Sequence, residues 1–196
     1  MAAPAKLNLK VYQGSTFQET LRWESSVKVY TPITAVTKSA PAVITAAAHS
    51  APVGWRVKFT NVLGMLELNS NDTYHTVTST TADDITINAL NTLSYKDYVS
   101  GGVVEYNQPI DLTGFTARMQ LRGSLADTVV IYELTTENNG ITIDNTNKTI
   151  NLIISATTTA SFEFSSAVYS LELVSSGGIV TPFANGTISL VKEVTR

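Results

Sequence analysis

The chain has 196 residues, of which 43% are hydrophobic and 15% charged, with a net charge of −3. This composition provides enough apolar material for a packed core and excludes a disordered chain. The absence of cysteine excludes disulfides, thiolate nucleophiles and cysteine-based metal sites. Lys and Arg occur singly along the chain, so we expect no sequence-independent nucleic-acid binding.

The N-terminal residues lack the apolar core of a signal peptide. No run in the sequence approaches the roughly 18 apolar residues that a membrane helix needs. We therefore expect a soluble protein that carries no export signal and does not act on a membrane.

Two strand candidates open the chain, at residues 7–11 and 17–23, and both are short stretches that mix apolar and polar side chains. From about residue 31 to residue 106 the chain becomes rich in Ala and Thr, and its strand candidates are weaker and more closely spaced. They lie at residues 43–45, 55–59, 74–78, 85–87 and 103–106.

Stronger alternation returns after residue 107, where β-branched residues dominate. Turn residues separate the strands, among them Asn138-Asn139-Gly140 and Gly177-Gly178, and Ser155 can cap one short helical turn. The predicted strands lie at residues 117–122, 141–143, 149–154, 169–173 and 187–192. The sequence therefore predicts an all-β protein.

The two flanks are predicted to form one domain. Residues 1–32 cannot bury enough surface alone, and residues 107–196 offer slightly too few strands for a sandwich. Joined, they predict a split antiparallel β-sandwich, interrupted by a small β-barrel over residues 33–106. Such an insertion is tolerated where the ends of the guest lie close together.

Candidate catalytic and metal-binding groups are few. The only histidines are His49 and His75, and no Gly-x-Ser-x-Gly motif is present. We interpret both histidines as structural, because Asp72 is weak support for a metal site at His75. Asp83-Asp84 could bind Ca²⁺, but no EF-hand pattern surrounds the pair, so we interpret it as an acidic turn.

Glu133 and Glu137 could serve as a pair of glycosidase carboxylates, but we favour solvated charges at a strand end and a turn. The segment Pro109-Ile110-Asp111-Leu112-Thr113-Gly114 predicts a turn that Asp111 caps and in which Gly114 adopts positive φ. We therefore predict no catalytic residue, no metal site and no cofactor.

Two further sets of residues are not expected to bind a ligand or to be modified. Trp23 and Trp55 are expected to anchor the core. The matches to Asn-x-Thr at Asn71, Asn147 and Asn185 are expected by chance in a chain rich in Asn and Thr.

The flanks contain an ordered series of motifs: Gly14-Ser15-Thr16-Phe17 with Trp23, residues 109–114, residues 117–122, Gly140 to Ile143, Thr157 to Thr159, Tyr169 to Leu173, and Gly186-Thr187 leading to residues 194–196. This series resembles a module of bacteriophage tail and baseplate proteins, including the N-terminal part of upper baseplate proteins. The resemblance implies an immunoglobulin-like sandwich. The long gap between Trp23 and Pro109 departs from that family.

A second series fills the gap: residues 33–36 and 41–45, His49, Gly54 with Val57, residues 64–69, Tyr74 with Val77, and residues 101–103. It resembles the small barrel named after the first catalytic-cysteine half-domain of ubiquitin-activating enzymes. Ser50 stands where that family often has Gly. Because the chain has no cysteine, thioester chemistry is impossible and the name implies no activity.

Together the resemblances imply a non-enzymatic structural protein of a bacteriophage virion. The expected role is a tail, neck or baseplate adaptor that docks on the tail or connector and helps hold fibres or spikes. Its partners would be other virion proteins and copies of itself in a symmetric ring. Two alternatives stay open at this point, a capsid decoration protein and a module that binds host glycan.

Overall fold

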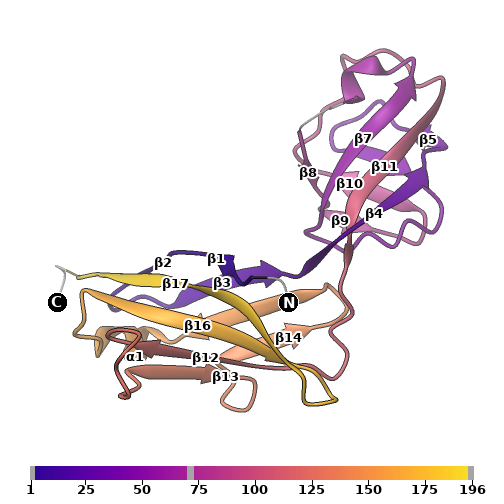
Figure 1. The fold of residues 1–196 in the computed structure, drawn as a ribbon. Coiled ribbons are helices and arrows are strands. Elements are labelled where there is room, and N and C mark those ends of the chain that lie inside the picture. The colour runs from indigo at the N-terminus through magenta and orange to yellow at the C-terminus, as the bar shows by residue number, and fades with distance from the viewer. Residues whose placement is uncertain (1–2, 70–72, 194–196) are drawn as a thin grey trace. The chain divides into compact units, whose positions relative to one another are not determined.

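The structure is a computed structural model that describes residues 3–69 and 73–193. It confirms the all-β prediction, since the described residues form seventeen strands, one short α-helix and one 3-10 helix. The chain divides into two compact units. We call residues Met1–Arg22 with Asp111–Arg196 the split unit, and residues Trp23–Ile110 the inserted unit (Figure 1).

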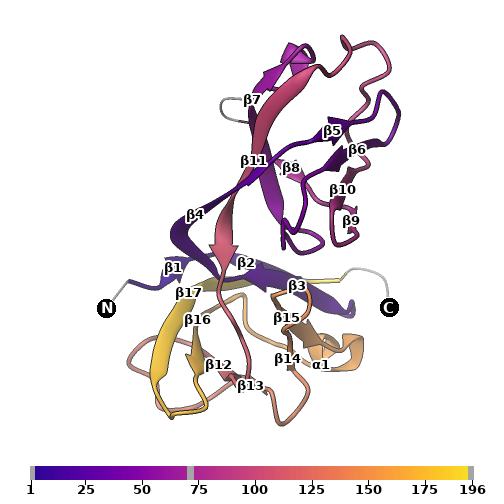
Figure 2. The ribbon, with the colours of Figure 1, turned by 90° about the vertical axis from the view of Figure 1, so that its right-hand side faces the viewer.

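The split unit contains two sheets. The six-stranded sheet has the order β1-β17-β16-β12-β13, with β2 also paired to β17, and the three-stranded sheet has the order β14-β15-β3. Their elements are β1 (Ala5–Lys6), β2 (Leu9–Tyr12), β3 (Phe17–Arg22), β12 (Thr116–Arg122), β13 (Tyr132–Thr135), β14 (Ile141–Asp144), β15 (Thr149–Ile154), α1 (Ala156–Ala160), β16 (Ser166–Val174) and β17 (Val180–Val191). In Figure 2, β3, β15 and β14 lie together on one side of this unit, and β17, β16 and β12 lie on the other.

Period-two alternation fixes which side of each sheet is buried. On β12 the residues Ala117, Met119 and Leu121 are buried while their neighbours are exposed or half-buried, and β16 alternates in the same way. Burying each large aliphatic side chain contributes about 1.5–3 kcal/mol. The turns also match the prediction. Gly178 between β16 and β17 has a φ of +78°, and Ser155 caps α1 by accepting a hydrogen bond from the Thr158 N–H.

The N-terminal strands differ from the prediction. The sequence predicts an antiparallel sandwich, whereas β1 and β2 both pair with β17 in parallel. The reason is connectivity. The start and the end of the chain enter the same sheet side by side in the same direction, with Leu9 opposite Ile188. The immunoglobulin-like character of this unit stays a prediction.

The inserted unit contains two four-stranded sheets, with the orders β5-β6-β10-β9 and β4-β11-β7-β8 (Figure 2). Its elements are β4 (Glu24–Pro32), β5 (Ala35–Val36), β6 (Ala42–Thr45), β7 (Arg56–Leu63), the 3-10 helix η1 (Leu66–Leu68), β8 (His75–Thr76), β9 (Ser79–Thr80), β10 (Asp84–Ile87) and β11 (Ser100–Pro109). Its core includes Trp55, Phe59, Ile44 and Tyr106. Trp55 is fully buried, as predicted, and its Nε1 donates to the Asn107 carbonyl at 2.8 Å.

The boundary of the inserted unit lies outside the predicted range of residues 33–106. The strands β4 and β11 pair along their length, from Glu24 opposite Pro109 to Pro32 opposite Val103. They therefore belong to the inserted unit, because both complete the sheet that contains β7. Trp23 is half-buried at the start of this unit and is not part of its buried core.

We predict that the split unit folds without the inserted unit. The Ile110 N–H donates to the Trp23 carbonyl at 3.0 Å, so the two ends of the inserted unit are adjacent. Residues 23–110 can then be replaced by a linker of about four residues, a usual length for a connection. We expect the shortened chain to unfold in one cooperative thermal transition, measured by far-ultraviolet circular dichroism. We expect the same of a protein that contains residues 23–110 alone. A broad, non-cooperative transition of either piece would contradict the division.

Candidate functional site

The two histidines lie apart in the inserted unit and serve its packing. His49 is 2% exposed, and its Nδ1 accepts a hydrogen bond from the Ala51 N–H at 3.0 Å. The Tyr106 hydroxyl donates to the His49 carbonyl. The His75 ring stacks on Phe59 at 5.6 Å, and burial lowers its pKa. Among the described residues, neither ring is hydrogen-bonded to a Ser or Thr hydroxyl, so no nucleophile and base are paired.

The acidic residues singled out in the sequence have local roles. The Asp83 carboxylate accepts from the Ala48 N–H at 3.1 Å, and the Asp84 carboxylate accepts from the Thr45 hydroxyl at 2.7 Å. Their own N–H groups donate to Thr81 Oγ1, which closes an acidic turn. Within residues 3–69 and 73–193, no three His, Asp or Glu side chains form a group that could hold a metal ion. Asp72 lies outside the described residues.

Glu133 and Glu137 lie on β13 and in the turn that follows it. Glu133 accepts a hydrogen bond from the Gln120 amide at 2.6 Å. Hydrogen bonds from the Glu137 backbone N–H and from the Thr135 and Thr136 side chains lower the pKa of Glu137. A glycosidase acid needs a raised pKa, so this environment does not suit Glu137 for that role.

Asp111 organises the re-entry of the chain into the split unit. Its Oδ1 accepts from the Thr113 hydroxyl at 2.9 Å and from Lys148 Nζ at 3.2 Å. Gly114 has a φ of +70°, as the predicted turn requires. Of the Asn-x-Thr positions, Asn71 lies outside the described residues, Asn147 donates to the Asp144 carboxylate, and Asn185 lies within β17 opposite Ser170. Residues 194–196, which end the flank motif series, also lie outside the described residues.

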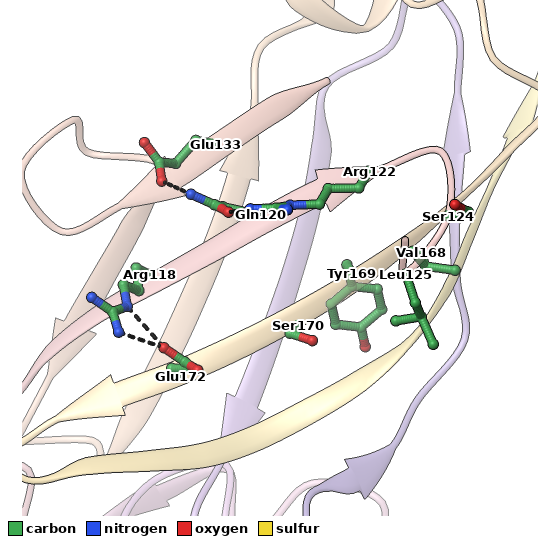
Figure 3. A pocket seen from close by; sticks show the side chains of 10 residues that line it. All are labelled: Arg118, Gln120, Arg122, Ser124, Leu125, Glu133, Val168, Tyr169, Ser170 and Glu172. Carbon is green, nitrogen blue, oxygen red and sulfur yellow. Dashed lines mark hydrogen bonds and ion pairs between the residues drawn. The ribbon is translucent and has the colours of Figure 1, made fainter. Parts of the chain in front are cut away.

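A hollow of about 420 Å³ lies on the outer face of the six-stranded sheet of the split unit (Figure 3). Strands β12, β13 and β16 and the start of the β12–β13 connection line it. The residues that line it are Arg118, Gln120, Arg122, Ser124, Leu125, Glu133, Val168, Tyr169, Ser170 and Glu172. It forms here because every second residue of β12 and β16 points away from the core.

Polar contacts tie the lining together. Arg118 forms an ion pair with Glu172 at 2.8 Å. Gln120 donates to Glu133, and Arg122 donates in turn to the Gln120 amide oxygen at 2.7 Å. Figure 3 shows them as two separate groups, the Arg118–Glu172 pair and the chain of contacts from Arg122 through Gln120 to Glu133, and we call both together the polar row. Each exposed ion pair of this kind contributes only about 0.2–1 kcal/mol to folding, so the row orients side chains more than it stabilises the fold.

Exposed aliphatic side chains that begin at Leu125, itself part of the lining of the hollow, form what we call the apolar rim. It consists of Leu125, Val129, Val130 and Ile131 in the connection between β12 and β13. Leu125 is 88% exposed and Val129 is 74% exposed. Single exposed aliphatic residues are ordinary, but four within seven positions mark a surface that another protein can cover.

The free edge of β13, next to the rim, is closed by a side chain. Asn138 Oδ1 accepts from the Thr135 N–H at 2.9 Å, and Asn138 Nδ2 donates to the Glu133 carbonyl at 3.0 Å. These contacts occupy backbone groups that an added strand would use. A partner would therefore contact the hollow and rim by packing on the sheet face.

The described helices include none long and apolar enough to cross a bilayer. No known protein-family model matches the chain, and no curated protein sequence matches it.

The rim and the hollow were not predicted from the sequence. The run Val129-Val130-Ile131 before Tyr132 carries an apolar signal, but it resembles any buried strand. Only the bend that precedes β13 places these side chains in solvent.

We predict that Asp111 makes the stability of the split unit depend on pH under acid conditions. Hydrogen bonding to Asn145, Thr113 and Lys148 lowers its pKa from 3.8 to about 2. The ionised carboxylate therefore stabilises the folded state above pH 3.8, and this contribution is lost as the pH falls through about 2.

The variant Asp111→Asn should have a lower melting temperature than the wild-type protein near neutral pH. This difference in melting temperature, which we call the gap, should disappear as the pH falls from 3.8 to about 2. Lys148→Met keeps the carboxylate and removes one donor, so it should show a smaller gap over the same range. Thermal melts across this range measure the effect. A gap that is constant with pH would show that Asp111 acts by shape alone.

Proposed function

We propose that the chain is a non-enzymatic structural protein of a bacteriophage particle, an adaptor that docks on the tail, neck or baseplate and helps hold fibres or spikes. The observation that carries the proposal is the exposed apolar rim of the split unit, beside a hollow lined by paired polar groups. The ordered motifs of the two flanks are the reason for proposing a bacteriophage particle, because they resemble bacteriophage tail and baseplate modules.

The rim has the composition of a protein-binding surface. Covering the exposed parts of Leu125, Val129, Val130 and Ile131 would contribute on the order of 4–7 kcal/mol. Loss of translational and rotational freedom on association costs about 4–15 kcal/mol, so the rim alone gives at best a weak complex. The polar row of the hollow supplies further contacts, and a ring of copies would multiply them.

The proposed partners are other virion proteins and further copies of this chain, and the proposed location is the virion. Nucleic acid is not a proposed partner, because the net charge is −3 and Lys and Arg occur singly along the chain.

Cryo-electron microscopy of the assembled particle tests the proposal directly. The expected result is a ring of copies at the neck or baseplate, with the rim of each copy against a neighbouring protein. Density spread over the capsid lattice would identify a decoration protein instead. Absence from the particle would overturn the structural role.

We predict that the double variant Leu125→Asp/Val129→Asp folds normally but is not incorporated into particles. Both side chains are solvent-exposed, so the free energy of unfolding should change by less than about 0.5 kcal/mol per site. Two buried carboxylates at an interface would be costly. Quantitative mass spectrometry of purified particles measures incorporation.

Ile179→Asp is the matched control, because Ile179 is an exposed aliphatic residue of the same unit in the β16–β17 turn, outside the rim. It should be incorporated at the wild-type level. Normal incorporation of the double variant would show that the rim is not the docking surface.

A further inference from the structure

A second surface lies on the inserted unit, on the outer face of the sheet β4-β11-β7-β8. Strand register places its residues on one side. Tyr30 of β4 and Lys58 of β7 both lie opposite Glu105 of β11, so the three side chains form one row across the sheet. Lys28 and Arg56 lie two residues before Tyr30 and Lys58, and therefore on the same face.

The centre of this face is the ring of Tyr74, which three cations approach. Arg56 Cζ lies 5.3 Å from the ring centroid, Lys28 Nζ 5.8 Å and Lys58 Nζ 6.0 Å. Lys28 Nζ also lies 3.3 Å from the Tyr74 hydroxyl. We call Lys28, Tyr30, Arg56, Lys58, Tyr74 and Glu105 the tyrosine face.

The charges of the tyrosine face do not cancel. Lys28 and Lys58 approach the same oxygen of Glu105, at 3.1 and 3.3 Å, and Glu105 is only 8% exposed. Arg56 is neutralised by Glu24 through Nε and Nη2. Two lysines thus share one carboxylate, which leaves one positive charge beside an aromatic ring.

Both tyrosines are accessible, since Tyr30 is 59% exposed and Tyr74 is 39% exposed. The C–H groups of a pyranose ring pack on such rings, while its hydroxyls need donors and acceptors together. The Arg56–Glu24 pair and the Asn107 amide, which donates to Glu24 at 2.8 Å, supply both kinds of group.

From this geometry we infer that the tyrosine face binds an acidic sugar of a glycan chain, with the sugar carboxylate at Lys28 and Lys58 and the ring against Tyr74. One surplus charge matches one carboxylate. A nucleic acid is the competing ligand, because its phosphates can pair with the same lysines and its bases can stack on the same rings. The inference goes beyond the proposed structural role and does not depend on where the chain lies in a particle.

The experiment is an NMR titration of the full ¹⁵N-labelled chain with the hexamer of galacturonic acid, compared with neutral maltohexaose. We expect shifts confined to β4, β7, β11 and residues 73–76. Maltohexaose should bind about tenfold more weakly, because it lacks the charged contact. Tyr74→Ala should weaken galacturonate binding about tenfold through the loss of the ring.

Lys28→Gln should remove most of the preference for the acidic sugar while Lys58 still pairs with Glu105, so the fold is kept. Tyr12→Ala is the matched control. Tyr12 is also exposed and has Lys10 5.6 Å from its ring, but it lies in the split unit. This variant should bind as the wild type does.

Four results would each overturn the inference. These are no binding of the galacturonate hexamer, equal binding of maltohexaose, unchanged binding by Tyr74→Ala, and tighter binding of a thymidine oligonucleotide at the same residues. The last result would make the tyrosine face a nucleic-acid surface. Each is independent of the particle experiment, so either proposal can fail alone.

Discussion

The pairing of β4 with β11 is the constraint on which the rest of the structure depends. These two strands begin and end the inserted unit, and their antiparallel ladder runs from Glu24 opposite Pro109 to Pro32 opposite Val103. The ladder brings Trp23 and Ile110 within hydrogen-bonding distance. Because the chain leaves and returns at one place, β3 can pair with β15 although their paired residues are more than a hundred positions apart. Without that closure, the entropy of a long loop would oppose the split unit.

The two units offer a partner surfaces of different chemistry. The split unit presents aliphatic side chains beside a row of paired polar groups, and Asn138 blocks the adjacent strand edge. The inserted unit presents tyrosine rings and lysines around a buried carboxylate. An apolar rim suits a protein surface, whereas an aromatic and basic face suits a polar ligand with flat apolar sides. A structural adaptor whose inserted unit also binds glycan would combine the two surfaces.

The sequence and the structure agree best where local signals are strong. The alternation of residues 117–122 and 169–173 predicted β12 and β16, and Gly177-Gly178 and Ser155 predicted a hairpin turn and a helix cap. Strands β4 and β13 were missed. In β4 the apolar residues Val27 and Tyr30 are three positions apart and lie on opposite faces, so neither face is marked by an apolar alternation. Asp111 and Gly114 were predicted as turn residues, and Glu105 was not singled out, although it joins two lysines.

By itself the sequence determined the all-β class, the interruption of one unit by another and the buried position of Trp55, because strand period, turn residues and large apolar side chains act locally. Tertiary structure decided the boundary of the inserted unit, the parallel pairing of β1 and β2 with β17, and both candidate surfaces. Those features depend on which strands become neighbours. Lys28, Lys58, Tyr74 and Glu105 come from four separate segments, and only the sheet register brings them together. No spacing along the chain encodes that register, since it is set by the packing of the whole core.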